Sequence, residues 1–86
     1  MTMSEAELKN LKGTKVVDAR GTSCPGPLLA AKKTMSEVPV NGIMEVLSSD
    51  PGTNKDIPAW CAKVGHEYLG LIAEPSYWRL FVRRKK

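Results

Sequence analysis

The chain has 86 residues, of which 42% are hydrophobic and 26% charged, a composition typical of a single soluble folded domain. A core of that size excludes the enclosure of a large substrate. No apolar run reaches the length of a membrane span, and the polar first residues MTMSEAELKNLKG differ from a secretory signal, so we expect a cytoplasmic protein.

The first 14 residues are predicted to be a flexible lead-in, with a short helical turn around Ala6–Leu11 that ends at Gly13. Residues 15–86 then form one domain. Its first segment, Lys15–Arg20, carries two valines and precedes a glycine, which predicts a strand.

The loop GTSCPGP follows and leads into LLAAKKTMSEV, whose apolar residues recur at helical spacing. Pro39 and Asn41–Gly42 end this helix. The next segment, GIMEVLSS, alternates apolar and polar residues around Met44, Glu45 and Val46 and is predicted to be a second strand.

A second helix is expected after the turn SDPGT. Thr53 and Asp56 resemble a capping box with Asp in place of Glu, and Gly65 suits the position after the helix. If the helix starts near Thr53, Pro58 should distort its second turn, because proline removes a backbone hydrogen bond. In the alternative interpretation, the regular helix begins at Pro58, since proline suits the first turn of a helix.

Residues 66–73 and 77–83 both have strand composition, and Glu74–Ser76 between them predicts a hairpin turn. In the last strand, alternation predicts one apolar face and one face with arginines. The resulting order, βαβαββ, predicts a two-layer α/β sandwich in which a mixed four-stranded sheet carries two helices on one face.

Cys24 lies where the first strand passes into the first helix. Pro25 suits the first helical position and Pro27 falls in the same turn, which places Cys24 at or beside the N-cap. The partial positive charge of a helix N-terminus lowers the pKa of a thiol there, and the two prolines should hold the sulfur at the surface. This setting favours an activated nucleophile over a buried small hydrophobe.

The remaining residues limit the reactions open to Cys24. Pro27 stands where a C-x-x-C oxidoreductase has its second cysteine, and nothing in the sequence brings His66 to Cys24 as a protease base. Cys61 lies on the apolar stripe of its helix and is expected in the core. Two cysteines and one histidine cannot form a four-ligand zinc site, so we expect no metal and no other cofactor. A single thiol that accepts a group and passes it on remains, and sulfur is its natural cargo.

At this point the sequence resembles a known family. DARGTSCPGP is similar to the D-x-x-G-x-x-C-P-x-P signature of the TusA (SirA-like) family of sulfur carrier proteins, through Asp18, Gly21, Cys24, Pro25 and Pro27. A second stretch, SDPGTNKDIPAWC, resembles the D-P-x-x-x-x-D-I-P run of the same family. The likeness covers roughly residues 15 to 84.

The resemblance implies a sulfurtransferase-type carrier that holds a persulfide on Cys24, and neither an independent hydrolase nor a metalloenzyme. It implies a cysteine desulfurase or a rhodanese-type protein as sulfur donor. It implies either a DsrE-like relay protein that leads to tRNA 2-thiolation, or a heterodisulfide-reductase-like system of sulfur oxidation, as acceptor. A carrier of this kind is expected to be a monomer that docks transiently.

The resemblance also suggests tasks for the neighbours of Cys24. Asp18 and Gly21 are expected to shape the loop. Asp56 is expected to cap its helix, with ordering of the Cys24 loop as the alternative. Three basic residues flank the thiol in this interpretation and either steer an acidic partner or form a solvated face: Arg20, Lys32 and Lys33.

Two other functions compete with the carrier. The basic end RLFVRRKK would suit a nucleic-acid-binding or regulatory module, or be only a solubilising tail. Tyr77 and Phe81 are its only candidates for base stacking, so direct nucleic-acid binding is not expected. The second competitor is a thiol redox enzyme that uses Cys24 with Cys61.

Overall fold

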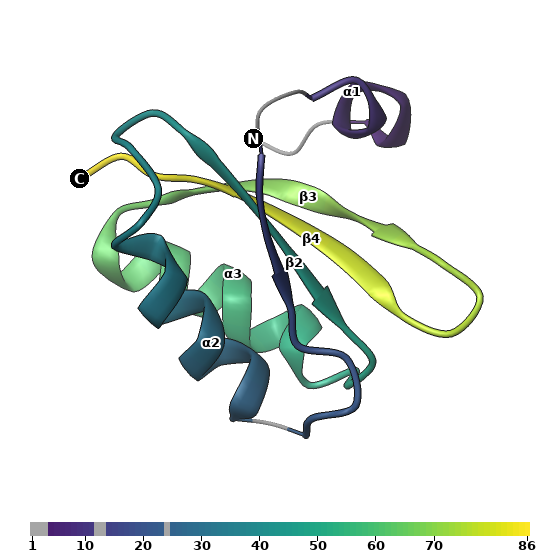
Figure 1. Ribbon diagram of the computed structural model, residues 1–86. Helices are drawn as coiled ribbons and strands as arrows, with labels where there is room; N and C mark the ends of the chain where they lie inside the picture. The colour runs from purple at the N-terminus through teal and green to yellow at the C-terminus, as the bar shows by residue number, and fades with distance from the viewer. Residues whose placement is uncertain (1–3, 12–13, 24) are drawn as a thin grey trace.

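The structure is a computed structural model that describes residues 4–11, 14–23 and 25–86. The elements of these residues are, in chain order, α1 (Glu5–Lys9), β1 (Lys15–Asp18), α2 (Gly26–Met35), β2 (Ile43–Ser48), α3 (Thr53–Val64), β3 (Glu67–Ala73) and β4 (Trp78–Arg83) (Figure 1). From β1 onward this is the predicted order βαβαββ. The first strand ends two residues earlier than expected.

The four strands form one mixed sheet in the order β1-β2-β4-β3. The pair β1 and β2 is parallel, with Val17 opposite Val46, and α2 connects the two strands. The pairs β2–β4 and β4–β3 are antiparallel, and Glu74 N–H donates to Tyr77 C=O at 2.8 Å in the turn of the predicted hairpin. The predicted mixed sheet is therefore confirmed.

Helices α2 and α3 cover one face of the sheet, which we call the helix face (Figure 1). Alternate residues of β2 and β4 point toward these helices, as predicted for the last strand. Cys61 of α3 is only 1% exposed, which confirms its predicted place in the core. The buried residues of the helix face are Val17, Ala31, Met35, Val38, Met44, Val46, Ile57, Trp60, Cys61, Leu80 and Val82.

Helix α1 lies on the opposite side of the sheet, which we call the second face (Figure 1). Ser4 and Glu7 form a capping box, because the Ser4 hydroxyl accepts the Glu7 N–H at 3.3 Å and the Glu7 carboxylate accepts the Ser4 N–H at 3.1 Å. Leu8 is 1% exposed and packs with Leu69, Ile72 and Phe81. A helical turn was expected near this place, but its docking on the sheet was not.

Ion pairs also lie on the second face. Arg79 Nε donates to Glu45 Oε2 at 2.7 Å, and its guanidinium lies 5.5 Å from the centroid of the Phe81 ring. Arg83 Nη1 donates to Glu67 Oε1 at 3.1 Å. Both arginines point away from the helix face, as the alternation of the last strand predicted.

The start of α3 differs from the expectation. Gly52 is its N-cap and no side chain caps it, so the predicted Thr53–Asp56 capping box is wrong. The reason is tertiary: Thr53 is 1% exposed, and its hydroxyl shares a hydrogen bond of 2.8 Å with the buried hydroxyl of Ser48. The alternative start at Pro58 is also wrong, since α3 runs through Pro58. Gly65 ends the helix as predicted, with φ 88 and its N–H on the Cys61 carbonyl at 2.8 Å.

The basic C-terminal residues are partly bound within the fold. Arg84 Nη1 donates to the carbonyls of Val38 at 2.6 Å and Met35 at 3.4 Å, where α2 ends. Its guanidinium thus ties the C-terminal segment to the end of α2 and to the turn that follows it. Across the described ranges of the chain, each helix is too short or too polar to cross a lipid bilayer.

Candidate functional site

The carboxyl ends of β1 and β2 meet at one edge of the sheet because the two strands are parallel. The loop after β1 and the turn after β2 therefore lie side by side. The Gly21 N–H donates to the Ser49 hydroxyl at 2.9 Å and joins them. Between them lies an open hollow of about 310 Å³, lined by Gly21, Thr22, Ser23, Ser49, Asp50 and Pro51.

Asp18 and Arg20 fix the beginning of this loop. The Asp18 carboxylate accepts the Arg20 backbone N–H at 3.1 Å and its Nε and Nη2 groups at 2.9 Å each. Hydrogen bonds from the Arg20 side chain and backbone lower the pKa of Asp18 to about 2. The guanidinium also lies 4.9 Å from the centroid of the Tyr77 ring. Arg20 thus joins the loop to the β3–β4 hairpin.

The loop then turns sharply toward α2. Gly21 has φ 83, a left-handed conformation that glycine adopts without steric cost. The Thr22 hydroxyl donates to the Ala19 carbonyl at 2.7 Å. The Gly26 N–H donates to the Ser23 carbonyl at 2.8 Å, which closes a turn where the loop enters α2.

Cys24 lies outside the described residues, and the structure places the residues on either side of it. Pro25 is the N-cap of α2, not its first helical residue as predicted, because the Pro25 carbonyl already accepts the Leu29 N–H at 3.0 Å. Gly26 begins the helix, and Pro27 is buried in the first turn. Cys24 therefore directly precedes the N-cap in the sequence.

Three other expected site residues lie on α2 and α3. Lys32 and Lys33 are in the last turn of α2, about 9 Å along the helix axis from Gly26. Their steering of a partner stays a prediction. Asp56 does not cap α3. It lines a hollow of about 230 Å³ between α2 and α3, together with Leu28, Lys32, Ala59, Trp60 and Lys63.

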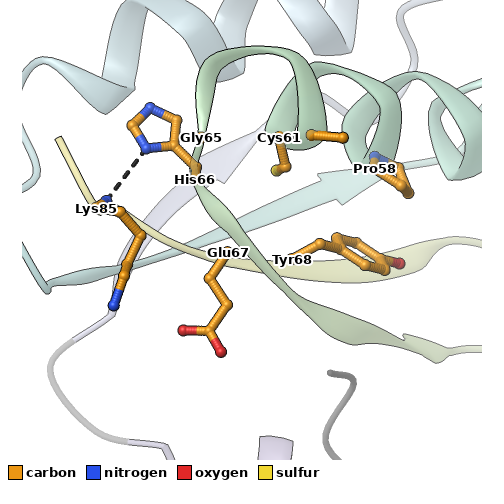
Figure 2. A pocket seen from close by; sticks show the side chains of 8 residues that line it. Pro58, Cys61, Gly65, His66, Glu67, Tyr68 and Lys85 are labelled. Carbon is orange, nitrogen blue, oxygen red and sulfur yellow. Dashed lines mark hydrogen bonds between the residues drawn. The ribbon is translucent and has the colours of Figure 1, made fainter.

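Cys61 has the opposite environment from an exposed thiol. Burial raises the pKa of the Cys61 thiol to about 11, so it is protonated at neutral pH. The adjacent Tyr68 also has a raised pKa, about 12, chiefly because of burial. Figure 2 shows both side chains at a hollow of about 600 Å³ between α3 and β3.

His66 belongs to this same hollow. Its Nδ1 accepts the Lys85 N–H at 3.2 Å, and its ring is edge-on to Trp60 with centroids 5.4 Å apart (Figure 2). Burial and the charges of Arg84 and Lys86 lower the pKa of His66. His66 follows the C-terminal end of α3, a 12-residue helix that is about 18 Å long, whereas Ser49 precedes its start. This hollow of about 600 Å³ therefore lies at the opposite end of α3 from Ser49.

Sequence reasoning missed the hydroxyl side chains that follow β2. Ser48 and Thr53 are buried and bonded to each other, and Ser49 binds the loop after β1. The only sequence signal was a pair of serines at the end of a predicted strand. Among the described residues, no three His, Cys, Asp or Glu side chains are grouped as metal ligands would be.

Comparisons with known proteins agree with this architecture. The family model described as Sulfurtransferase TusA matches residues 15–84. A protein of Archaeoglobus fulgidus, named provisionally as a sulfur carrier, is 51% identical over 71 residues, which cover 83% of this chain and 97% of that protein. The sulfur carrier protein TusA of Pseudomonas syringae pv. tomato is 35% identical over 83 residues, which cover 96% of this chain and 98% of that protein.

The fold also matches a solved structure. The crystal structure of a SirA-like protein from Desulfitobacterium hafniense superposes with a TM-score of 0.67. It covers 85% of this chain and 100% of that chain at 22% identity, so it supports the fold alone.

Proposed function

Because the chain belongs to the TusA family, we propose that it is a sulfur carrier that accepts sulfane sulfur as a persulfide on Cys24 and passes it to an acceptor protein. The observation that carries this assignment is the burial of Cys61, the other cysteine of the chain. Cys61 is 1% exposed with a raised pKa, so a partner can neither reach nor easily ionise it. Cys24 remains as the thiol for transfer.

The transfer needs no cofactor in this proposal. The Cys24 thiolate attacks the outer sulfur of a donor persulfide. The S–S bond of the donor breaks, the donor thiolate leaves with the electron pair, and Cys24 becomes a persulfide. An acceptor thiolate then attacks the outer sulfur on Cys24 in the same way and regenerates the Cys24 thiolate. Electrons balance in both steps without an added oxidant.

Family membership supports a proposal for the protein classes of the donor and the acceptor. We propose a cysteine desulfurase or a rhodanese-type protein as the donor. We propose a DsrE-like relay protein for tRNA 2-thiolation, or a heterodisulfide-reductase-like system for sulfur oxidation, as the acceptor. A monomer that docks transiently suits both routes.

The competing nucleic-acid module has less support. Phe81 is 1% exposed and cannot stack on a base. Arg20 already lies over the Tyr77 ring, and Arg84 binds the end of α2. These contacts occupy Arg84 and one face of the Tyr77 ring.

The experiment is sulfur loading followed by intact-protein mass spectrometry. After incubation with a cysteine desulfurase and L-cysteine, the wild-type chain should gain one sulfur atom and Cys24→Ser should gain none. Cys61→Ala should load like the wild type. No gain in the wild type, or an equal gain in Cys24→Ser, overturns the carrier. Loss of loading in Cys61→Ala would instead favour the thiol redox enzyme.

A further inference from the structure

We propose that Ser49 is a positioning residue: its hydroxyl holds the loop that leads to Cys24 and thereby keeps the thiol reactive. This inference rests on the proposed sulfur carriage for its purpose. Its evidence is separate and lies in the contacts between the loop after β1 and the turn after β2.

The Ser49 side chain forms a hydrogen bond just beyond the point where the backbone pairing of β1 and β2 stops. The Ala19 N–H still donates to the Leu47 carbonyl at 2.8 Å and continues the β1–β2 ladder. Two residues later, the Gly21 N–H donates to the Ser49 hydroxyl at 2.9 Å. A side chain thus extends the parallel pairing to a residue with φ 83, which no regular strand could include.

The backbone around Ser49 is braced on both sides. Before it, the Ser48 hydroxyl is buried, bonds to Thr53 at 2.8 Å and accepts the Asp50 N–H at 3.1 Å. After it, the Asp50 carboxylate accepts the Gly52 N–H at 3.0 Å. The hydrogen bonds of Ser48 and Asp50 therefore fix the backbone of this turn. The Ser49 hydroxyl reaches the Gly21 N–H because of that backbone, and not because its own side chain is packed.

Ser49 itself is exposed, so removal of its hydroxyl leaves no cavity. The effect of the substitution should fall on the loop from Gly21 to Ser23, whose far end is tied to α2 by the Gly26 N–H on the Ser23 carbonyl. Cys24 lies between these two anchors in the sequence. The sequence predicts that the Cys24 thiol lies beside the positive end of α2. In our proposal, release of the loop on the β2 side weakens that placement and lowers the thiolate fraction.

The test measures the rate at which iodoacetamide alkylates Cys24 as a function of pH. The Cys24→Ser variant gives the background rate of alkylation at Cys61. Ser49→Ala should react about two- to five-fold more slowly at neutral pH, the range that a helix terminus contributes. Its rate profile should move to higher pH, and the rates should converge with the wild type in alkaline solution. Ser49→Thr keeps a hydroxyl and should restore the wild-type profile.

Ser36→Ala is the matched control. It also removes one exposed hydroxyl that makes one hydrogen bond, to the Lys33 carbonyl at 2.8 Å, but at the other end of α2. Its profile should equal that of the wild type. A loss of stability alone would lower the melting temperature without moving the pH profile, so both are measured on every variant.

Three results would overturn the proposal: an unchanged profile in Ser49→Ala, an equal shift in Ser36→Ala, or failure of Ser49→Thr to restore the rate. Alkylation needs no sulfur donor, so this test is independent of sulfur loading. A wild-type chain that takes up no sulfur while Ser49→Ala still shifts the profile would refute the carrier and leave the positioning of the thiol standing.

Discussion

The two faces of the sheet are built in different ways. Eleven buried residues fill the helix face: ten come from two long helices and three strands, and Val38 comes from the turn after α2. Four buried residues fill the apolar part of the second face, under a helix of five residues. A helix this short is not stable by itself in water, so α1 depends on its docking. The comparison teaches that the helix face holds the fold together, whereas the second face carries a separable attachment and a set of ion pairs.

The largest expected effect is the loss of stability on shortening a side chain in the core of the helix face. Ile57 is fully buried in α3, and Ile57→Ala should lower the free energy of unfolding by about 2–5 kcal/mol, because it removes apolar contacts and leaves a cavity. Urea denaturation followed by circular dichroism measures the change. Val64→Ala, at an exposed position of the same helix, should change stability by less than about 0.5 kcal/mol.

A smaller loss is expected from the matching change on the second face. Leu8→Ala should cost about 1.5–3 kcal/mol, the free energy of burying a leucine side chain. Amide hydrogen exchange should accelerate in α1 and stay slow in β4, because α1 can detach while the sheet remains folded. Exchange that accelerates equally in both elements would show that the second face is as integral as the helix face.

The smallest effect concerns the ion pair on the second face. A double-mutant cycle with Glu45→Gln and Arg79→Gln should give a coupling energy of about 1 kcal/mol, between the values for exposed pairs and for fully satisfied charged hydrogen bonds. The pair is only partly exposed, so added salt should reduce the coupling weakly. A coupling near zero would mean that this ion pair between β2 and β4 adds no measurable stability to the second face.

Much of the helix face could be predicted from the sequence, because its residues follow regular periods. The alternation in Trp78–Arg83 gave the right two sides of β4, and helical spacing put Cys61 in the core. The second face has no such repeat. Leu8 is an isolated apolar residue in a polar segment, and its partners come from strands far along the chain. The division of the chain at residue 15 stays a prediction, and the burial of Leu8 counts against a wholly separate lead-in.

At the candidate site, the local sequence pattern predicted the helices correctly but gave the wrong residues at their N-termini. The two prolines did mark the start of α2, but Pro25 takes the N-cap and moves the helix by one residue. Thr53 has the spacing of a capping residue, yet the buried Ser48 hydroxyl takes its hydrogen bond. The tie between Ser49 and Gly21 joins residues 28 positions apart, and no local pattern encodes it.

Gly21 has a consequence for natural and laboratory variation at this position. A side chain built there would meet no atom within 4 Å, so space does not limit the choice of residue. The limit is handedness, because φ is +83 and L-amino acids with a Cβ rarely adopt it. Tolerance should therefore not decline gradually with side-chain size. Every replacement of glycine should cost stability to a similar degree, whatever its size. Asparagine and aspartate should be the mildest replacements.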